Sequence, residues 1–183
     1  MENGFMDREK KKETGKEIKE WSRSILLAVV IAVIIRLFFL EVFLVEGSSM
    51  EPTLDHQERL IVNKVVYLVR EPEVGEIVVF NYSPKRDFIK RIIAEEGDTV
   101  EIEDDSLYVN DTPVEEPYLD KGITISDFGP VTIPEGYFFV LGDNRSNSMD
   151  SRDPSVGPVS QEDIKGRAEL VFWPVNQARL LDP

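Results

Sequence analysis

Few side chains in this sequence could serve as a nucleophile or as its base. There is no cysteine and only one histidine, His56, so a thiolate nucleophile, a cysteine-bound zinc and an HExxH metal site are excluded. His56 lies in a polar stretch and is expected at the surface. A reactive serine would therefore need lysine as its general base, a known variant of the serine triad. That lysine must be neutral at the working pH, so burial or a neighbouring cation has to lower its pKa from about 10.4 to about 7–8.

The segment EGSSMEPTL, residues 46–54, offers such a serine. Gly47 frees the backbone and Pro52 restrains the residue before it, which favours a sharp turn. A turn of this kind can expose a serine hydroxyl and aim a backbone N–H at a developing oxyanion. Taken alone, the segment would be interpreted as a linker turn whose serines make local hydrogen bonds.

The segment DFIKRII, residues 87–93, offers the lysine. As a strand it would place Lys90 and Arg91 on opposite faces that are otherwise apolar, so at least one of the two cations is expected to be half-buried. Arg91 would stay charged and pair with a carboxylate, whereas Lys90 can lose its proton. Taken alone, the pattern also fits an edge strand whose two cations reach the solvent.

A long apolar segment before these residues predicts a membrane span. Residues 25–35 are all apolar, and residues 21–40 provide twenty positions, which at about 1.5 Å each cross a hydrocarbon core of about 30 Å. No A-x-A-like site follows the apolar residues, so an uncleaved signal anchor is expected rather than a cleaved signal peptide. The alternative is a core helix of a soluble protein, but no later segment offers it a helical partner.

Lysine and arginine residues set the expected orientation of the span. Seven of them precede the apolar residues 25–35, and none occurs within fifteen residues after Leu40. The positive-inside rule therefore predicts a single-pass protein of the cell membrane, with residues 1–20 as a charged cytoplasmic segment and residues 41–183 as an extracytoplasmic domain. Nine residues separate Leu40 from Ser49, at most about 30 Å of extended chain, so a site that contains Ser49 would work close to the outer membrane surface.

Beyond the span, short apolar segments separated by Gly and Pro predict a mainly β domain with antiparallel sheets. The expected strands are rich in β-branched and aromatic residues and lie in Arg59–Val69, Gly75–Asn81, Asp87–Ile93, Asp98–Asn110, Gly136–Asp143 and Gly166–Trp173. Asp98–Asn110 predicts a hairpin that turns at Asp104–Asp105, and residues from about 104 to 130, which are acidic and poor in apolar side chains, predict a small excursion from the main sheets. The whole net charge of −14 lies after residue 46, which disfavours nucleic acid as a partner.

Three segments in order after one N-terminal apolar span resemble bacterial type I signal peptidases, above all the short single-span Gram-positive form. They are GSSMEPT, DFIKRIIAEEGD and GDNRSNSMDSR, and GEIVVF at residues 75–80 is a further family segment. The resemblance runs from about residue 21 to residue 173. It implies an antiparallel β catalytic domain and a membrane-anchored serine endopeptidase that removes signal peptides from secretory preproteins. Cleavage would follow small residues at the first and third positions before the cut, and no metal or organic cofactor is implied.

The same resemblance assigns roles to single residues. Ser49 corresponds to the nucleophile, Lys90 to the general base and Ser148 to the serine that hydrogen-bonds and orients this lysine. The residues that would hold the site together, through carboxylate–guanidinium pairs where they are charged, are Arg91, Asp143, Asn144, Asp150 and Arg152.

One position departs from some relatives, in which a serine hydroxyl two places before the nucleophile stabilises the oxyanion. Here that position is Gly47, so the oxyanion would use the backbone N–H of Ser49 and a second donor that the sequence does not identify. Shallow apolar pockets for the small substrate residues are expected at the apolar neighbours of the two catalytic residues, namely Val45, Met50, Leu54 and Ile89.

Two alternatives remain at this point. A self-cleaving serine–lysine regulator would have similar chemistry, although it would normally carry a DNA-binding module. A membrane-anchored β module that only binds would explain the span and the strands, but it would leave the serine, the lysine and the segment around Ser148 as a coincidence.

Overall fold

The computed structural model describes residues 21–31, 33, 39–119 and 124–181, and the chain divides into two compact units, Met1–Phe39 and Leu40–Pro183. In the first unit, residues 21–31 and 33 are helical. The predicted span is therefore only partly covered, because 32 and 34–38 lie outside the described residues, as does the predicted cytoplasmic segment 1–20. Among the described residues, no helix has both the length and the apolar content to cross a membrane.

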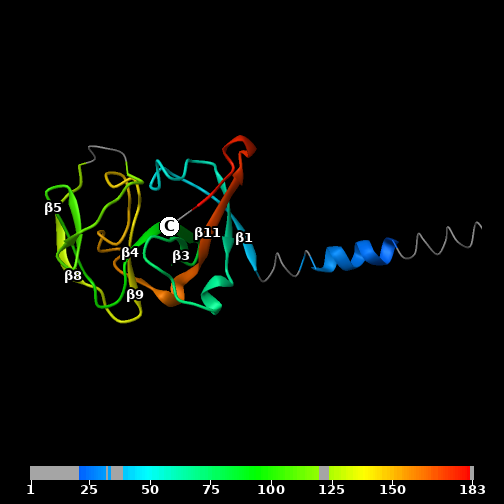
Figure 1. The fold of residues 1–183 in the computed structure, drawn as a ribbon, viewed down its shortest axis with the longest axis horizontal. Coiled ribbons are helices and arrows are strands. Elements are labelled where there is room, and N and C mark those ends of the chain that lie inside the picture. Colours follow the sequence, from blue (N-terminus) through cyan, green and yellow to red (C-terminus); the bar gives the residue numbers. More distant parts are fainter. Residues whose placement is uncertain (1–20, 32, 34–38, 120–123, 182–183) are drawn as a thin grey trace, which may run out of the picture. The chain divides into compact units, whose positions relative to one another are not determined.

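The second unit contains two antiparallel sheets, seen on the right and left of the folded body in Figure 1. The large sheet has the strand order β1-β2-β11-β3-β4-β9-β10, with β12 paired to β11. Its strands are β1 (Leu40–Leu44), β2 (Arg59–Asn63), β3 (Ile77–Ser83), β4 (Arg86–Ala94), β9 (Tyr137–Leu141), β10 (Val159–Ser160), β11 (Ile164–Trp173) and β12 (Arg179–Leu180). Leu40 thus begins β1, whereas the sequence had placed it in the span.

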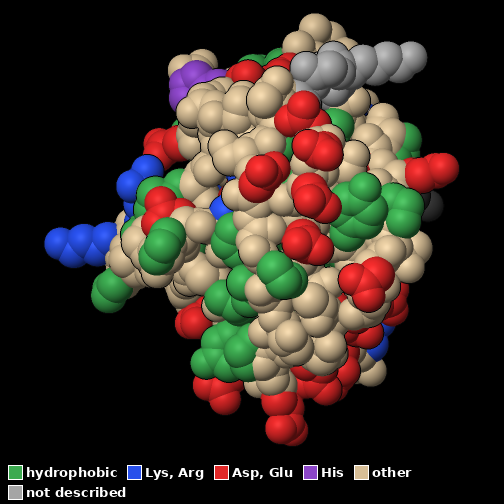
Figure 2. All heavy atoms as spheres, turned by 90° about the vertical axis from the view of Figure 1, so that its left-hand side faces the viewer, with side chains coloured by type: hydrophobic (Ala, Val, Ile, Leu, Met, Phe, Trp, Pro, Cys, Tyr) green, Lys and Arg blue, Asp and Glu red, His purple; other side chains and the backbone are tan. Residues whose placement is uncertain are grey.

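The small sheet has the order β7-β6-β5-β8. Its strands are β5 (Thr99–Glu103), β6 (Ser106–Val109), β7 (Thr112–Pro113) and β8 (Phe128–Thr132). The predicted hairpin is confirmed, because β5 and β6 pair around Asp104 and Asp105, whose positive φ angles of 49° and 61° suit a two-residue hairpin turn. The small sheet runs from Thr99 to Thr132 and so extends beyond the predicted excursion of about 104–130 at both ends. Figure 2 shows that carboxylate side chains are spread over the face of the molecule on which β5 and β8 lie, with few cations among them.

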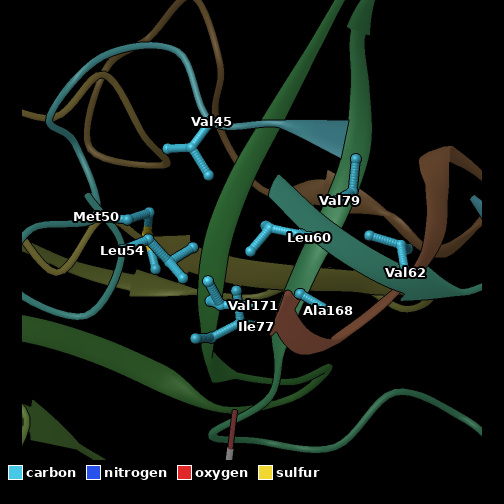
Figure 3. Packing of buried hydrophobic residues seen from close by; sticks show 9 residues of the cluster. All are labelled: Val45, Met50, Leu54, Leu60, Val62, Ile77, Val79, Ala168 and Val171. Atoms are coloured by element: carbon cyan, nitrogen blue, oxygen red, sulfur yellow. The ribbon is translucent and has the colours of Figure 1, made fainter. Parts of the chain in front are cut away.

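Among the described residues, buried apolar side chains of the large sheet belong to three clusters, two of which hold the loop after β1 and the small sheet. The cluster in Figure 3 packs residues of β2, β3 and β11 against the loop that follows β1: Val45, Met50, Leu54, Leu60, Val62, Ile77, Val79, Ala168 and Val171. A second cluster joins β4 and β9 to the small sheet and includes Ile93, Val100 and Phe139. The two sheets therefore share one of the hydrophobic cores that hold the unit together.

Two strand expectations need correction. The predicted strand Arg59–Val69 ends at Asn63, because the Asn63 side-chain oxygen accepts hydrogen bonds from the N–H groups of Val65 and Val66 and starts a turn. The 3₁₀ helix η1 (Val66–Leu68) follows; η2 (Gln161–Asp163) and η3 (Val175–Gln177) flank β11. Strand β4 is not an edge strand, since it lies between β3 and β9, and both of its adjacent cations are buried.

Candidate active site

Ser49 lies in a closed loop between β1 and β2. Backbone hydrogen bonds between Val45 and residues 57 and 58 join the two ends of the loop. Met50 and Leu54 are fully buried and anchor the loop in the core. Gly47 has a φ of +99°, which favours glycine, and its N–H donates to Nδ1 of His56 at 3.1 Å. His56 is exposed as expected, yet it helps to hold the loop that carries Ser49.

Lys90 reaches this loop from the middle of the large sheet. Its Nζ lies 2.8 Å from Ser49 Oγ and donates to the carbonyl oxygen of Ile89, also at 2.8 Å. The side chain is buried, with 3% of the residue exposed. Desolvation lowers the pKa of Lys90 to about 8, although the negative charges of Asp150 and Asp143 oppose this shift. A neutral amine is therefore accessible near neutral pH, within reach of a hydroxyl proton.

Each of the two carboxylates beside Lys90 is paired with an arginine. Asp143 accepts two hydrogen bonds from Arg91, at 3.1 and 2.9 Å, and Asp150 accepts two from Arg152, both at 2.8 Å. Arg91 also donates to the carbonyl of Gly75 at 2.7 Å. Desolvation outweighs the opposing charges of these two carboxylates, so the pKa of the Lys90 amine is lowered.

The segment 142–152 is joined to the serine loop by direct hydrogen bonds. Asn144 donates from its backbone N–H to the carbonyl of Ser49 and from its side chain to the carbonyl of Ser48, both at 3.0 Å. Thr53 donates from its hydroxyl to Asp143 at 2.5 Å. Gly142 fits closely beside them: a Cβ there would lie within 3.0 Å of the Ser49 carbonyl oxygen and of the Ser148 side chain. These contacts fix where the Ser49 backbone lies.

The structure does not contain the hydrogen bond that was expected between Ser148 and Lys90. The Ser148 hydroxyl is buried but has no hydrogen-bond partner among the described residues. Lys90 directs its amine to Ser49 and to the carbonyl of Ile89 instead. Ser148 is nevertheless close to the site, because both it and the Ser49 carbonyl lie against Gly142.

The backbone N–H groups of the serine loop differ in whether they already donate a hydrogen bond within the protein. None of the hydrogen bonds formed within the described ranges uses the N–H of Ser49, which leaves it free to bind an oxyanion. The N–H of Gly47 is already bonded to His56, so it does not supply the second donor.

A cavity of about 490 Å³ opens beside Ser49 and Lys90. Val45, Met50 and Ile89 line it, as expected, but Leu54 does not. The pocket role expected for Leu54 is wrong, because its side chain points into the core and is fully buried. The lining residues that the sequence did not indicate are Phe43, Leu44, Glu46, Ser48, Lys85, Arg86, Asp87, Phe88, Asn147 and Met149.

Two further residues that the sequence did not indicate reach the site from the segment after β7. The carboxylate of Glu116 pairs with Arg145, and the ring of Tyr118 covers the guanidinium of Arg91. Their only signal in the sequence was an acidic stretch, which by itself is typical of a solvated surface.

Comparison with known proteins identifies the family of this chain. The family model described as signal peptidase, peptidase S26, matches residues 18–173. The chain belongs to the signal peptidase family. Signal peptidase I T of Bacillus subtilis (strain 168) is 46% identical over 170 residues, which cover 87% of this chain and 88% of that protein. Signal peptidase I of Bacillus licheniformis is 43% identical and covers 97% of this chain and 100% of its own length.

A crystal structure of a signal peptidase I from Enterococcus faecalis V583 is 35% identical, with a TM-score of 0.46, and covers 54% of this chain and 97% of that one. The family assignment depends on the sequence matches alone. As a member of the signal peptidase family, the chain is a serine endopeptidase.

Proposed function

We propose that this endopeptidase removes N-terminal signal peptides from secretory preproteins, with Ser49 as the nucleophile and Lys90 as the general base. The observation that carries the assignment is the distance of 2.8 Å between the buried Nζ of Lys90 and the Oγ of Ser49. Burial lowers the pKa of Lys90 to about 8, and a lysine general base must have such a lowered pKa to be neutral near physiological pH. A module that only binds would leave this contact between a buried lysine and a serine unexplained.

The reaction follows the acyl-enzyme course of serine peptidases. Neutral Lys90 takes the hydroxyl proton as Ser49 Oγ attacks the scissile carbonyl, and the resulting oxyanion accepts a hydrogen bond from the Ser49 N–H. The C–N bond then breaks, and protonated Lys90 gives its proton to the leaving amine of the mature protein. In the second half, neutral Lys90 takes a proton from water as the water oxygen attacks the acyl carbon. The bond between that carbon and Ser49 Oγ then breaks, protonated Lys90 returns the proton to Oγ, and the signal peptide leaves with a carboxyl end.

The cavity supports a preference for small residues before the cleavage site. Val45 and Met50 line the cavity, but each exposes only a few per cent of its surface. We infer that they form a shallow wall and not a deep pocket. Ile89 adds an apolar wall directly before the base. We infer that these side chains contact the first and third substrate residues and leave room only for small ones.

Membrane anchoring through the apolar segment that includes residues 25–35 is part of the proposal. The helical residues described in the first unit expose large apolar side chains, such as Trp21 at 74% and Leu26 at 64%, which suit a lipid environment better than water. The seven preceding cations favour a cytoplasmic N-terminus, with the catalytic domain on the other side of the membrane.

A cleavage assay tests the assignment. The full chain, purified in detergent, is incubated with a preprotein that has alanine at the first and third positions before the cut, and the products are sequenced. Ser49→Ala and Lys90→Ala should each lower kcat by at least about a thousandfold while leaving the unfolding transition cooperative. Surface variants of the same residue types, Ser155→Ala and Lys64→Ala, should keep wild-type activity. Cleavage by Lys90→Ala at the wild-type rate would remove lysine from the base role.

A further inference from the structure

The segment after β7 places two side chains against the charged frame of the active site. Glu116 accepts hydrogen bonds from both terminal nitrogens of Arg145, one of them at 2.8 Å. The Tyr118 hydroxyl donates to Glu116 Oε1 at 2.7 Å, and the Tyr118 ring centre lies 3.9 Å from the guanidinium carbon of Arg91. Burial raises the pKa of Tyr118, which keeps its hydroxyl protonated as a donor. We call Glu116 and Tyr118 together the clasp.

Both arginines under the clasp are deeply buried and connect directly to the reacting groups. Arg145 donates from Nε to the carbonyl of Gly142 at 3.1 Å, and its own carbonyl accepts a hydrogen bond from Arg152. Arg145 is therefore fixed between the clasp and the turn that begins at Gly142. The N–H of Asn144, in the same turn, holds the carbonyl of Ser49. A displacement of Arg145 would therefore be passed to the nucleophile through two hydrogen bonds.

Arg91 connects the other half of the clasp to the base. It follows Lys90 on β4 and neutralises Asp143, one of the two carboxylates whose charge opposes proton loss from Lys90. The Tyr118 ring covers the guanidinium in a cation–π contact and keeps water from the Arg91–Asp143 pair. Removing the ring would hydrate and weaken this pair, so that more of the Asp143 charge would act on Lys90.

We propose that Glu116 and Tyr118 are positioning residues for the serine–lysine pair. Through Arg145 the clasp keeps the backbone of Ser49 in place. Through Arg91 it keeps the negative charge of Asp143 neutralised beside Lys90. The inference rests on the proposed roles of Ser49 and Lys90. It gives the small sheet a part in catalysis, because the clasp follows β7 directly and contacts Arg91 of the large sheet and Arg145 in the loop after β9.

Steady-state kinetics of the full chain in detergent, with the same preprotein, test the proposal. Glu116→Gln and Tyr118→Ala should lower kcat between about tenfold and a hundredfold, since small displacements of reacting groups are costly, while KM changes less than about twofold. Tyr118→Phe keeps the ring over Arg91 and should recover most of the kcat that Tyr118→Ala loses. Glu115→Gln and Tyr137→Ala, at exposed positions, are the matched controls and should resemble the wild type.

Two readouts separate positioning from plain stabilisation. The midpoint of the pH dependence of kcat/KM should move to higher pH in Tyr118→Ala, and the effect of Glu116→Gln should disappear when Arg145 is already replaced by glutamine. If kcat and the pH midpoint of both folded variants equal those of the wild type, the clasp is only structural and the proposal is refuted. If Tyr118→Ala does not fold, Glu116→Gln and its double variant with Arg145→Gln decide the question.

Ser49→Ala and Lys90→Ala in the same assay distinguish a failure of the clasp from a failure of the proposed function. If both remain active, the serine–lysine assignment fails. If both are inactive while the clasp variants match the wild type, only the clasp is refuted.

Discussion

Replacing the buried lysine by methionine should stabilise the domain while it abolishes cleavage. The pKa of Lys90 falls from 10.5 to about 8 because its charged form is desolvated in the folded protein. Keeping this amine charged below pH 8 therefore costs about 3 kcal/mol of folding free energy. Lys90→Met removes that cost but also loses the two hydrogen bonds of the amine, each worth about 1 kcal/mol. The net gain at pH 7 should be about 1–2 kcal/mol.

The pH dependence of this gain gives the prediction its test. The unfolded chain binds more protons at this lysine than the folded chain between pH 8 and 10.5, so the stability of the wild type should rise with pH over that range. Urea unfolding of the full chain in detergent, followed through the fluorescence of Trp173, would compare the two proteins from pH 6 to 10. The advantage of Lys90→Met should be greatest below pH 8 and should be lost as the pH approaches 10. A variant that is less stable than the wild type at pH 7 would refute the claim that desolvation dominates.

Three further outcomes are expected. In the wild type, log kcat/KM should rise with a slope of one up to about pH 8 and then level off, because only the neutral amine of Lys90 acts as the base; a midpoint near pH 10 would contradict this. Gly142→Ala should lower kcat by about a hundredfold, since its Cβ displaces the Ser49 carbonyl, and a wild-type kcat would show that the turn yields without moving the nucleophile. Asp143→Asn should cost about 3 kcal/mol of unfolding free energy in urea titrations, because it leaves Arg91 buried without a counter-ion; a loss below about 1 kcal/mol would mean that Arg91 finds another partner.

Local sequence patterns predicted most strands and singled out Ser49 and Lys90, but they did not show that Lys90 and Arg91 are both buried. Alternation along residues 87–93 placed Lys90 and Arg91 on opposite faces without showing that β4 is flanked on both sides. One of its neighbours, β9, lies more than forty residues further along the chain. The burial of both cations is thus a consequence of strand order, which no local pattern contains.

The expectations for Leu54 and Ser148 were wrong, and Glu116 was missed, for a similar reason. Leu54 is close to Ser49 in sequence, but the closed loop turns its side chain into the core, away from the cavity. Ser148 lies beside the site, yet the carbonyl of Ile89 takes the amine contact that was expected for it. Glu116 joins Arg145 across twenty-nine positions, so its role depends on how the two sheets pack against each other. Such contacts follow from tertiary packing and not from the properties of a short segment.

Because β1 is paired with β2 along all five of its residues, the link between Leu40 and the serine loop is a rigid spacer. Ser49 therefore cannot move far to reach a peptide bond, so a precursor must place its scissile peptide bond at a fixed position. A precursor whose cleavable bond cannot extend to that point would escape cleavage, so the enzyme would select its substrates by the reach of the cleavage region as well as by residue size.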